Sequence, residues 1–261
     1  MLDLTGQKAL VCGSTQGIGR ATANLLARQG ATITLLARNA TALAAVAAEL
    51  PRPANQTHQW QAADFAATEA LRRAAEQALA ASGGFDILVN NTGGPAPGPV
   101  LEADVDAFRR AFEMHVLGNQ VLVQTLTPHM KARRYGRIIQ IISTSVREPI
   151  PGIGVSNTTR WAVAAWAKTL SRELAPFGIT VNNVLPGFTD TDRLKELFES
   201  RAAREGVPYE AVVEQARKGV PMGRFATIDE IAAAVAFLAS REASYVTGIN
   251  LPVDGGRLNS M

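Results

Sequence analysis

Three glycines lie where a short apolar run gives way to a helical pattern, within residues 8–20, KALVCGSTQGIGR. Residues 9–11 predict a buried strand, and the apolar spacing after Gly17 predicts a helix. Gly13, Gly17 and Gly19 therefore occupy the turn, where glycine allows backbone angles and close approaches that other residues do not. A helix start presents unpaired N–H groups and a partial positive charge, so this turn predicts a phosphate-binding site.

A second strand is predicted over residues 31–37, at the distance expected of a strand–helix–strand unit that binds a dinucleotide. Arg38 follows this strand directly, and no acidic residue stands at its end. In such folds this position meets the adenosine ribose, where an acid binds the 2′-hydroxyl of NAD and an arginine suits the 2′-phosphate of NADP. We therefore predict NADP in preference to NAD. The alternative is that Arg38 is a solvated surface residue.

The rest of the chain alternates between strand and helix patterns. Strands are predicted over 58–63, 86–90, 137–143, 178–185 and 250–253, and helices over 40–50, 67–82, 104–130, 156–175 and 228–240. This alternation predicts the α/β class: a single Rossmann-type, doubly wound parallel sheet with helices on both faces. No linker or repeat divides the chain, so we expect one dinucleotide-binding domain over residues 1–261. The charged stretch at about 192–220 breaks the rhythm and predicts either a helical lid or a solvated excursion.

Composition excludes several classes of partner. Lysine and arginine exceed aspartate and glutamate by 26 to 23, a net charge of only +3, and the basic residues form isolated pairs. Nucleic acid is therefore not expected as a partner. The single cysteine, Cys12, precludes an intrachain disulfide and fits a reducing compartment. Without an apolar run of about 20 residues or a signal-peptide pattern, we expect a cytoplasmic protein, no membrane and no metal site.

Ordered motifs give the chain a resemblance to the short-chain dehydrogenase/reductase family, particularly its 3-oxoacyl-carrier-protein reductase branch, nearly end to end. The matching segments are the glycine loop over 13–19, the adenine-contacting Asp64, Asn90-Asn91-Thr92-Gly93, the nicotinamide segment over 186–191, Thr247-Gly248 and Asp254-Gly255-Gly256. The resemblance implies a shared set of cofactor-binding residues. They are Gly13, Ser14, Thr15, Gln16, Gly17, Ile18, Gly19, Arg38, Asp64, Asn91, Gly93, Arg160, Pro186, Gly187, Thr189 and Thr191.

The catalytic centre departs from the family pattern, which uses Asn, Ser, Tyr and Lys with the last two spaced Tyr-x-x-x-Lys. None of the tyrosines here is followed by lysine at that distance. The flanking sequence places Ser156 at the tyrosine position and Arg160 at the lysine position, while His115 takes the place of the asparagine. Ser143, thirteen positions before Ser156, matches the family's serine. One of the four catalytic residues therefore survives.

This substitution changes the chemistry that the resemblance implies. The family reduces a carbonyl by hydride transfer from the nicotinamide, and a proton must reach the forming alkoxide. Tyrosine, with a pKa of about 10, can be tuned towards neutrality by a lysine cation, whereas a serine hydroxyl is too weak an acid. Arginine stays charged and does not shuttle protons. Arg160 lies one helical turn from Ser156 and can still donate hydrogen bonds to the nicotinamide ribose.

Three interpretations follow. The favoured one is an NADP-dependent reductase of a small carbonyl compound, such as a 3-oxoacyl substrate, whose proton comes from His115 or from a water held by Ser143 and Ser156. In that case His115 could equally be a helix histidine that only satisfies a neighbour's hydrogen bond. The second is an NADP-binding sensor or partner subunit without redox activity. The third is a reaction without net redox, as in the halohydrin dehalogenases, which show the opposite pattern of retained tyrosine and lost cofactor loop.

Two further expectations concern the substrate and the assembly. Ile150, Pro151, Ile153 and Phe188 predict an apolar substrate pocket, by their places after Ser143 and after the sixth strand. Trp161 and Trp166 lie on the helix that family members use for dimers and tetramers. We therefore expect a homotetramer, with a homodimer as the second choice and core packing of the tryptophans as the alternative.

Overall fold

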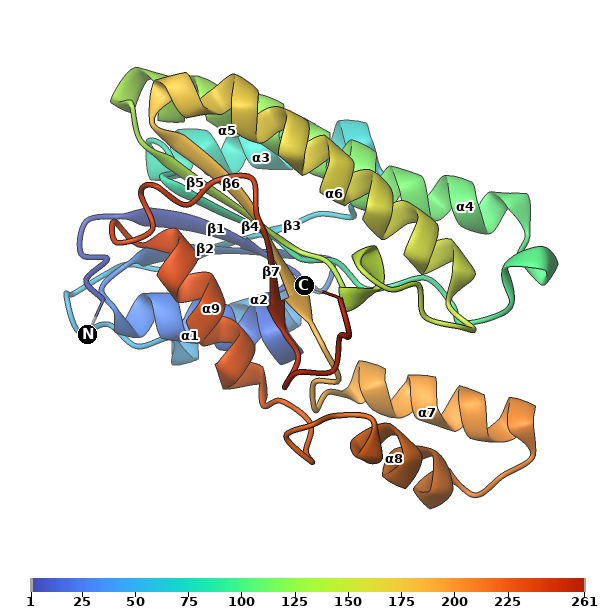
Figure 1. Ribbon diagram of the computed structural model, residues 1–261. Helices are drawn as coiled ribbons and strands as arrows, with labels where there is room; N and C mark the ends of the chain where they lie inside the picture. Colours follow the sequence, from blue (N-terminus) through green and yellow to red (C-terminus); the bar gives the residue numbers. More distant parts are fainter. Residues whose placement is uncertain (1, 261) are drawn as a thin grey trace.

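Seven parallel strands form one sheet in the order β3-β2-β1-β4-β5-β6-β7. The computed structural model describes residues 2–260, and Figure 1 shows the sheet with helices on both sides. The strands are β1 (Lys8–Cys12), β2 (Thr32–Ala37), β3 (Gln59–Ala62), β4 (Ile87–Asn90), β5 (Gly136–Ile141), β6 (Ile179–Pro186) and β7 (Asn250–Val253). The predicted doubly wound parallel architecture is therefore confirmed.

The strand order places the ends of β1 and β4 side by side. The chain runs outward from β1 through β2 to β3, then returns to β4 beside β1, with Ala9 opposite Ile87 and Val11 opposite Val89. Ligands of open α/β sheets bind outside the carboxyl ends of the strands at such a reversal. The segments that follow β1 and β4 are therefore the first place to look for a site.

The helices cover both faces of the sheet. They are α1 (Gly17–Arg28), α2 (Ala40–Glu49), α3 (Thr68–Ser82), α4 (Val105–Phe112), α5 (Gly118–Arg133), α6 (Gly154–Leu174), α7 (Asp192–Glu205), α8 (Tyr209–Lys218) and α9 (Ile228–Ala239). Short turns of 3₁₀ helix lie at Val100–Glu102, Thr144–Val146 and Ala175–Phe177.

Each face has its own apolar core. Helices α1, α2 and α9 pack on one face, where Leu26 and Val235 belong to one buried cluster with Ile33 of β2. Helices α3, α5 and α6 pack on the other face, where Leu122 lies in the cluster with Leu88 of β4. The central strands β1 and β4 are buried on both sides, which explains their nearly continuous apolar sequence.

The helix predicted over 104–130 is interrupted in the structure. Helices α4 and α5 are joined by a π-helical turn, Glu113–Leu117. A π turn holds one extra residue, so it shifts the helical phase. His115 is buried, whereas Phe112, three residues earlier, is 44 % exposed, although a regular helix would place the two on the same side.

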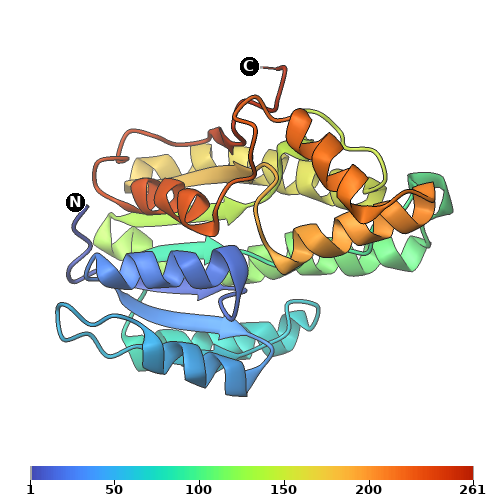
Figure 2. The same cartoon turned by 90° about the horizontal axis from the view of Figure 1, so that it is seen from below.

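Helices α7 and α8 build a small core of their own. Leu194, Phe198 and Val212 are buried together, and the Phe198 ring lies 5.6 Å from that of Phe188 between centroids. Figures 1 and 2 show the two helices side by side, outside the two helical layers of the sheet. The charged stretch after residue 191 is thus two helices joined to the sheet at their ends.

Across residues 2–260, no helix combines the length and the apolar character that a membrane crossing requires.

Candidate cofactor and catalytic site

The glycine loop between β1 and α1 packs tightly against the end of β4. Gly13 and Gly17 have φ angles of 58° and 54°, a region that favours glycine. A Cβ on Gly13 would overlap the carbonyl oxygen of Asn91, and one on Gly19 would overlap that of Gly13. The amide Nδ2 of Asn91 donates to the Gly13 carbonyl oxygen at 3.2 Å. Only glycine fits at positions 13 and 19, and Asn91 holds the loop in place.

This loop has the features that a dinucleotide phosphate requires. Helix α1 begins at Gly17, and the side chain of its N-cap residue, Gln16, makes no capping hydrogen bond, so the first N–H groups remain available. The Ser14 hydroxyl is fully buried and has no hydrogen-bond partner within residues 2–260. A Cβ on Gly17 would face Thr191 at 3.7 Å, with no closer neighbour. The residues therefore fit a diphosphate between the loop and Thr191.

The residues predicted at the adenosine end lie after β2 and β3. Arg38 is exposed, and within residues 2–260 it has no ion pair or hydrogen bond. Asp64 is also exposed, and its Oδ1 accepts a hydrogen bond from the Ala66 N–H at 3.0 Å. The guanidinium of Arg38 is therefore free to bind an anionic group.

The segment after β6 turns sharply beside the end of β7. A Cβ on Gly187 would lie 2.7 Å from the Cα of Asp254, so the two segments of the chain are in contact here. The Thr189 hydroxyl donates to the Gly187 carbonyl oxygen at 3.2 Å, and the Thr191 hydroxyl accepts from the Leu194 N–H at 3.2 Å as the N-cap of α7. The predicted nicotinamide segment thus also starts the helix that leaves the sheet.

Arg160 is buried beneath the ends of β4 and β5. Its Nη1 donates to the Ile141 carbonyl oxygen at 3.0 Å and its Nη2 to the Thr92 carbonyl oxygen at 3.3 Å. Burial lowers its pKa to about 10, and the positive charge of Arg193 adds to this effect. Arg160 therefore remains a cation at neutral pH. No carboxylate within residues 2–260 forms an ion pair with it.

His115 is 1 % exposed, on the π-helical turn. Its Nδ1 lies 2.5 Å from the Thr92 hydroxyl oxygen, and its Nε2 is buried with no partner in residues 2–260. Burial and the nearby charge of Arg160 lower the pKa of His115 to about 2. The imidazole is therefore neutral near pH 7, where it is a weak acid. This counts against the expectation that His115 supplies the proton.

The two serines have different surroundings. The Ser143 hydroxyl accepts a hydrogen bond from the Ser145 N–H at 3.0 Å and so caps the 3₁₀ turn that follows β5. Ser156 is half-buried in the first turn of α6, one turn before Arg160. Ser143 lies two residues after Ile141, whose carbonyl oxygen Arg160 binds, so Ser143 and Arg160 both lie at the end of β5.

Sequence reasoning missed the role of Thr92. Its hydroxyl meets His115 and its carbonyl oxygen meets Arg160, so it links the two substituted catalytic positions. One signal was available: Thr92 stands where the family's Asn-Asn-Ala-Gly signature has alanine.

Sequence reasoning also missed Arg193 of α7. Its Nη2 donates to the Pro95 carbonyl oxygen at 2.5 Å, and its Nη1 lies 3.3 Å from Oε2 of Glu196. A Cβ on Gly94 would lie 3.5 Å from Nη2 of Arg193. Two arginines eleven residues apart, Arg193 and Arg204, are the only signal the sequence offered, since that spacing places both on one helix face.

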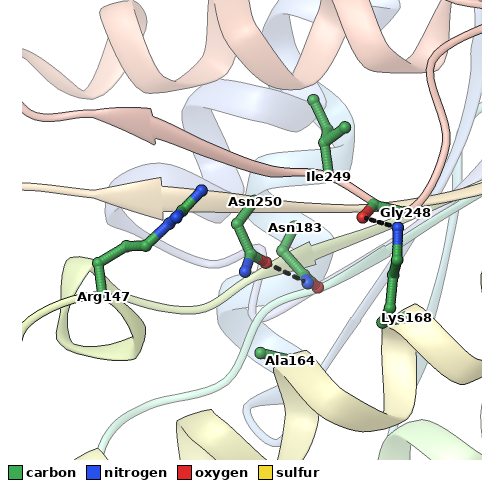
Figure 3. A pocket seen from close by; sticks show the side chains of 7 residues that line it. All are labelled: Arg147, Ala164, Lys168, Asn183, Gly248, Ile249 and Asn250. Carbon is green, nitrogen blue, oxygen red and sulfur yellow. Dashed lines mark hydrogen bonds between the residues drawn. The ribbon is translucent and has the colours of Figure 1, made fainter. Parts of the chain in front are cut away.

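A hollow of about 610 Å³ lies elsewhere, between β6, β7 and α6 (Figure 3). Lys168 crosses its edge to donate to the Gly248 carbonyl oxygen at 3.0 Å, and Asn183 Nδ2 donates to Asn250 Oδ1 at 2.7 Å. None of the predicted site residues lines it. Within residues 2–260 there is also no group of side chains suited to hold a metal ion.

Comparisons with known proteins cover almost the whole chain. A family model described as Enoyl-(Acyl carrier protein) reductase matches residues 13–257. The NADPH-dependent reductase BacG of Bacillus subtilis is 30% identical, over 99% of this chain and 100% of its own. The 3-oxoacyl-[acyl-carrier-protein] reductase FabG of Aquifex aeolicus is 32% identical, over 98% of both chains. The solved structure of L-sorbose reductase from Gluconobacter frateurii, complexed with NADPH and L-sorbose, has a TM-score of 0.92 at 30% identity, covering 100% and 99%.

Proposed function

Since the chain belongs to the short-chain dehydrogenase/reductase family, we propose that it is an NADPH-dependent reductase of a small carbonyl compound. The observation that carries the proposal is the intact phosphate cradle, with its free helix start and the buried Ser14 hydroxyl, together with the buried cation Arg160, which binds the residue after Asn91. A cradle that only glycine can form, close to a fixed positive charge, suits a bound dinucleotide.

The cofactor would be held at three places along the carboxyl edge of the sheet. The glycine loop, residues 13–19, would bind the diphosphate. Arg38 would bind the 2′-phosphate, which gives the preference for NADP over NAD, and Asp64 would meet the adenine. Asn91, Gly93 and the segment over 186–191 would hold the nicotinamide end, with Thr189 and Thr191 as its polar side chains. NADPH-dependent relatives and an NADPH-complexed neighbour support this use of the cofactor.

The residues of this chain would then prepare the substrate for reduction. A bound NADPH would supply a hydride, and the carbonyl oxygen of the substrate would then gain negative charge. Arg160 would stabilise that charge electrostatically, because a fixed cation in a buried site is worth more there than in water. Ser143 and Ser156 would donate hydrogen bonds to the same oxygen.

We assign the proton to a water molecule held by Ser143 and Ser156. His115 is neutral, and its Nδ1 is occupied by Thr92. Arg160 keeps its proton at neutral pH, and serine is a weak acid. Water near a cation and two hydroxyls is the remaining source, and it is in exchange with solvent.

The substrate class, the lid and the assembly complete the proposal. A 3-oxoacyl thioester is one candidate, because FabG enzymes are among the relatives. Helices α7 and α8 would close over the substrate as a lid on a single domain. Trp161, 48 % exposed, lies on α6, so this helix would form the interface of a cytoplasmic homotetramer or homodimer.

The first experiment is a titration of the purified protein with NADPH and with NADH, followed by fluorescence. A panel of ketones, quinones and 3-oxoacyl thioesters should follow, with oxidation of NADPH as the readout. We expect NADPH to bind more tightly than NADH, and at least one carbonyl compound to be reduced. If neither cofactor binds, the proposal fails. If NADPH binds and every carbonyl compound is left unchanged, the second candidate, an NADP-binding sensor or partner subunit, takes its place.

A further inference from the structure

Two arginines from different helices hold the loop that follows β4. Arg160 of α6 donates to the carbonyl oxygen of Thr92, and Arg193 of α7 donates to that of Pro95. The acceptors are three residues apart in the chain. The two guanidinium groups are close enough for the charge of Arg193 to affect Arg160. The loop that follows β4 therefore has two positive charges beside it.

These charges have little compensation from the protein itself. Arg160 is 8 % exposed, and its recorded partners within residues 2–260 are the carbonyl oxygens of Thr92 and Ile141. The acidic partner of Arg193 is Glu196, whose side chain is 64 % exposed and 3.3 Å away. A buried cation without an anion is costly, so such a site gains free energy when an anion binds.

The lid helix brings a third cation to the same side. Arg204 lies eleven residues after Arg193, three helical turns along the same face of α7. A Cβ on Gly152 would lie 3.1 Å from Nη2 of Arg204, so this arginine meets the loop that follows Ser143. Its acidic neighbour, Glu205, lies at 3.8 Å and is shared with Arg201. The substrate pocket, which was expected to be apolar, thus has an arginine beside the loop that carries Ile150 and Ile153.

We propose that Arg193, with the positive charge of Arg160 behind it, binds a carboxylate of the substrate, so that the protein acts on oxo acids in preference to neutral carbonyl compounds, 3-oxoacyl thioesters included. This inference rests on the proposed function and names its substrate class. Arginine suits a carboxylate because its planar N–H groups match the two oxygens. The cofactor diphosphate is the other possible source of an anion. We favour the substrate because the diphosphate already has a cradle at the start of α1.

The test is a comparison of acids with their amides. The acids are acetoacetate, 2-oxobutyrate and benzoylacetate, and each is compared with its primary amide. Calorimetry measures their binding to the protein alone and to the protein saturated with NADP⁺. The oxidised cofactor is used because it cannot reduce them. The variant is Arg193→Gln. The matched control is Lys195→Gln on the same helix, where the lysine side chain is 66 % exposed.

We expect at least one acid to bind more tightly than its amide, with and without NADP⁺. Arg193→Gln should weaken the binding of that acid by about tenfold, which is the contribution of one charge-assisted hydrogen bond. The affinities for the amide and for NADP⁺ should stay unchanged. Lys195→Gln should match the wild type. Equal affinity for every acid and its amide, including undetectable binding of both, overturns the proposal. A loss confined to NADP⁺ affinity in Arg193→Gln also overturns it and assigns Arg193 to the diphosphate.

The two proposals fail in different ways. Absence of NADP⁺ binding by the wild type contradicts the proposed function, whereas the acid and amide titrations of the cofactor-free protein still measure the carboxylate subsite by itself.

Discussion

The hydroxyl oxygen of Thr92 lies 2.5 Å from Nδ1 of His115, and this contact ties the π-helical turn to the loop after β4. The carbonyl oxygen of Thr92 also accepts a hydrogen bond from Arg160. Two substituted catalytic positions are thus connected through one residue. Hydrogen bonds in such a buried place are strong and hold the side chains that make them in position.

His115→Asn should keep NADPH affinity and change turnover by no more than about threefold, because a neutral, buried imidazole is not the proton donor. Turnover and NADPH affinity measured on wild type and variant check this. A loss of turnover by about a hundredfold with NADPH affinity intact would instead assign the proton to His115. His58→Gln is the control, since His58 lies beside β2 and accepts from the Ile33 N–H.

Acid should destabilise the wild type more than His115→Asn. The folded-state pKa of His115, about 2, is below its ordinary value of 6.5, so the unfolded chain binds the proton more readily. The stabilisation is therefore present above pH 6.5 and is lost as the pH falls below it, by up to about 1.4 kcal/mol per pH unit. Urea unfolding at pH 7 and pH 5 measures the difference. If the difference in free energy of unfolding between wild type and variant does not change with pH, the assignment of a neutral, buried His115 is contradicted.

Arg38→Asp should weaken NADPH binding by about tenfold or more and NADH binding by less than about twofold, because only NADPH carries the 2′-phosphate. Fluorescence titration gives the ratio of variant to wild-type dissociation constants for each cofactor. Arg73→Asp, on the exposed side of α3, has the same charge change and should alter neither. Equal losses for both cofactors would remove the basis for the NADP assignment.

Gly13→Ala should abolish NADPH binding and lower the free energy of unfolding. The added methyl group would overlap the Asn91 carbonyl oxygen, and alanine at a φ of 58° costs about 1–3 kcal/mol. Urea unfolding and NADPH titration measure both effects. Gly98→Ala is the matched control, because a Cβ there meets nothing within 4 Å. Normal NADPH binding by Gly13→Ala would show that the cradle is not the phosphate site.

Phe198→Ala should loosen α7 and α8 without unfolding the sheet. Phe198 is 5 % exposed and packs against Phe188 and Phe225 at 5.6 and 5.7 Å between ring centroids. Loss of a buried phenylalanine costs about 3–5 kcal/mol, and this core is separate from those on the two faces of the sheet. Hydrogen exchange should therefore accelerate over 192–218 and stay unchanged in β1 and β4. Equal acceleration in the sheet would show that α7 and α8 are part of one cooperative core.

The strand and helix order could be predicted because central strands such as β1, β2 and β4 are nearly continuous apolar runs and the longer helices have apolar residues at regular spacing. The glycine loop could be predicted because a close approach such as that of Gly19 to Gly13 leaves no other residue possible. The π-helical turn could not be predicted, because the apolar spacing over 104–130 is still close to helical when one extra residue is present. The inward direction of Arg193 could not be predicted either. Helix α7 carries many charged residues, and only the fold decides which of them face the site.

The π-helical turn Glu113–Leu117 also sets how the two helices around it can evolve. It accommodates one residue more than a regular helix of the same rotation, so deleting a single residue there would restore a regular helix and leave α4 and α5 facing as they do now. The side chains inside the turn would be re-spaced, and His115 would lose the position from which it meets Thr92. Length in this segment is therefore under tighter constraint than side-chain identity, and insertions or deletions should be tolerated in the proline-rich loop before α4 instead.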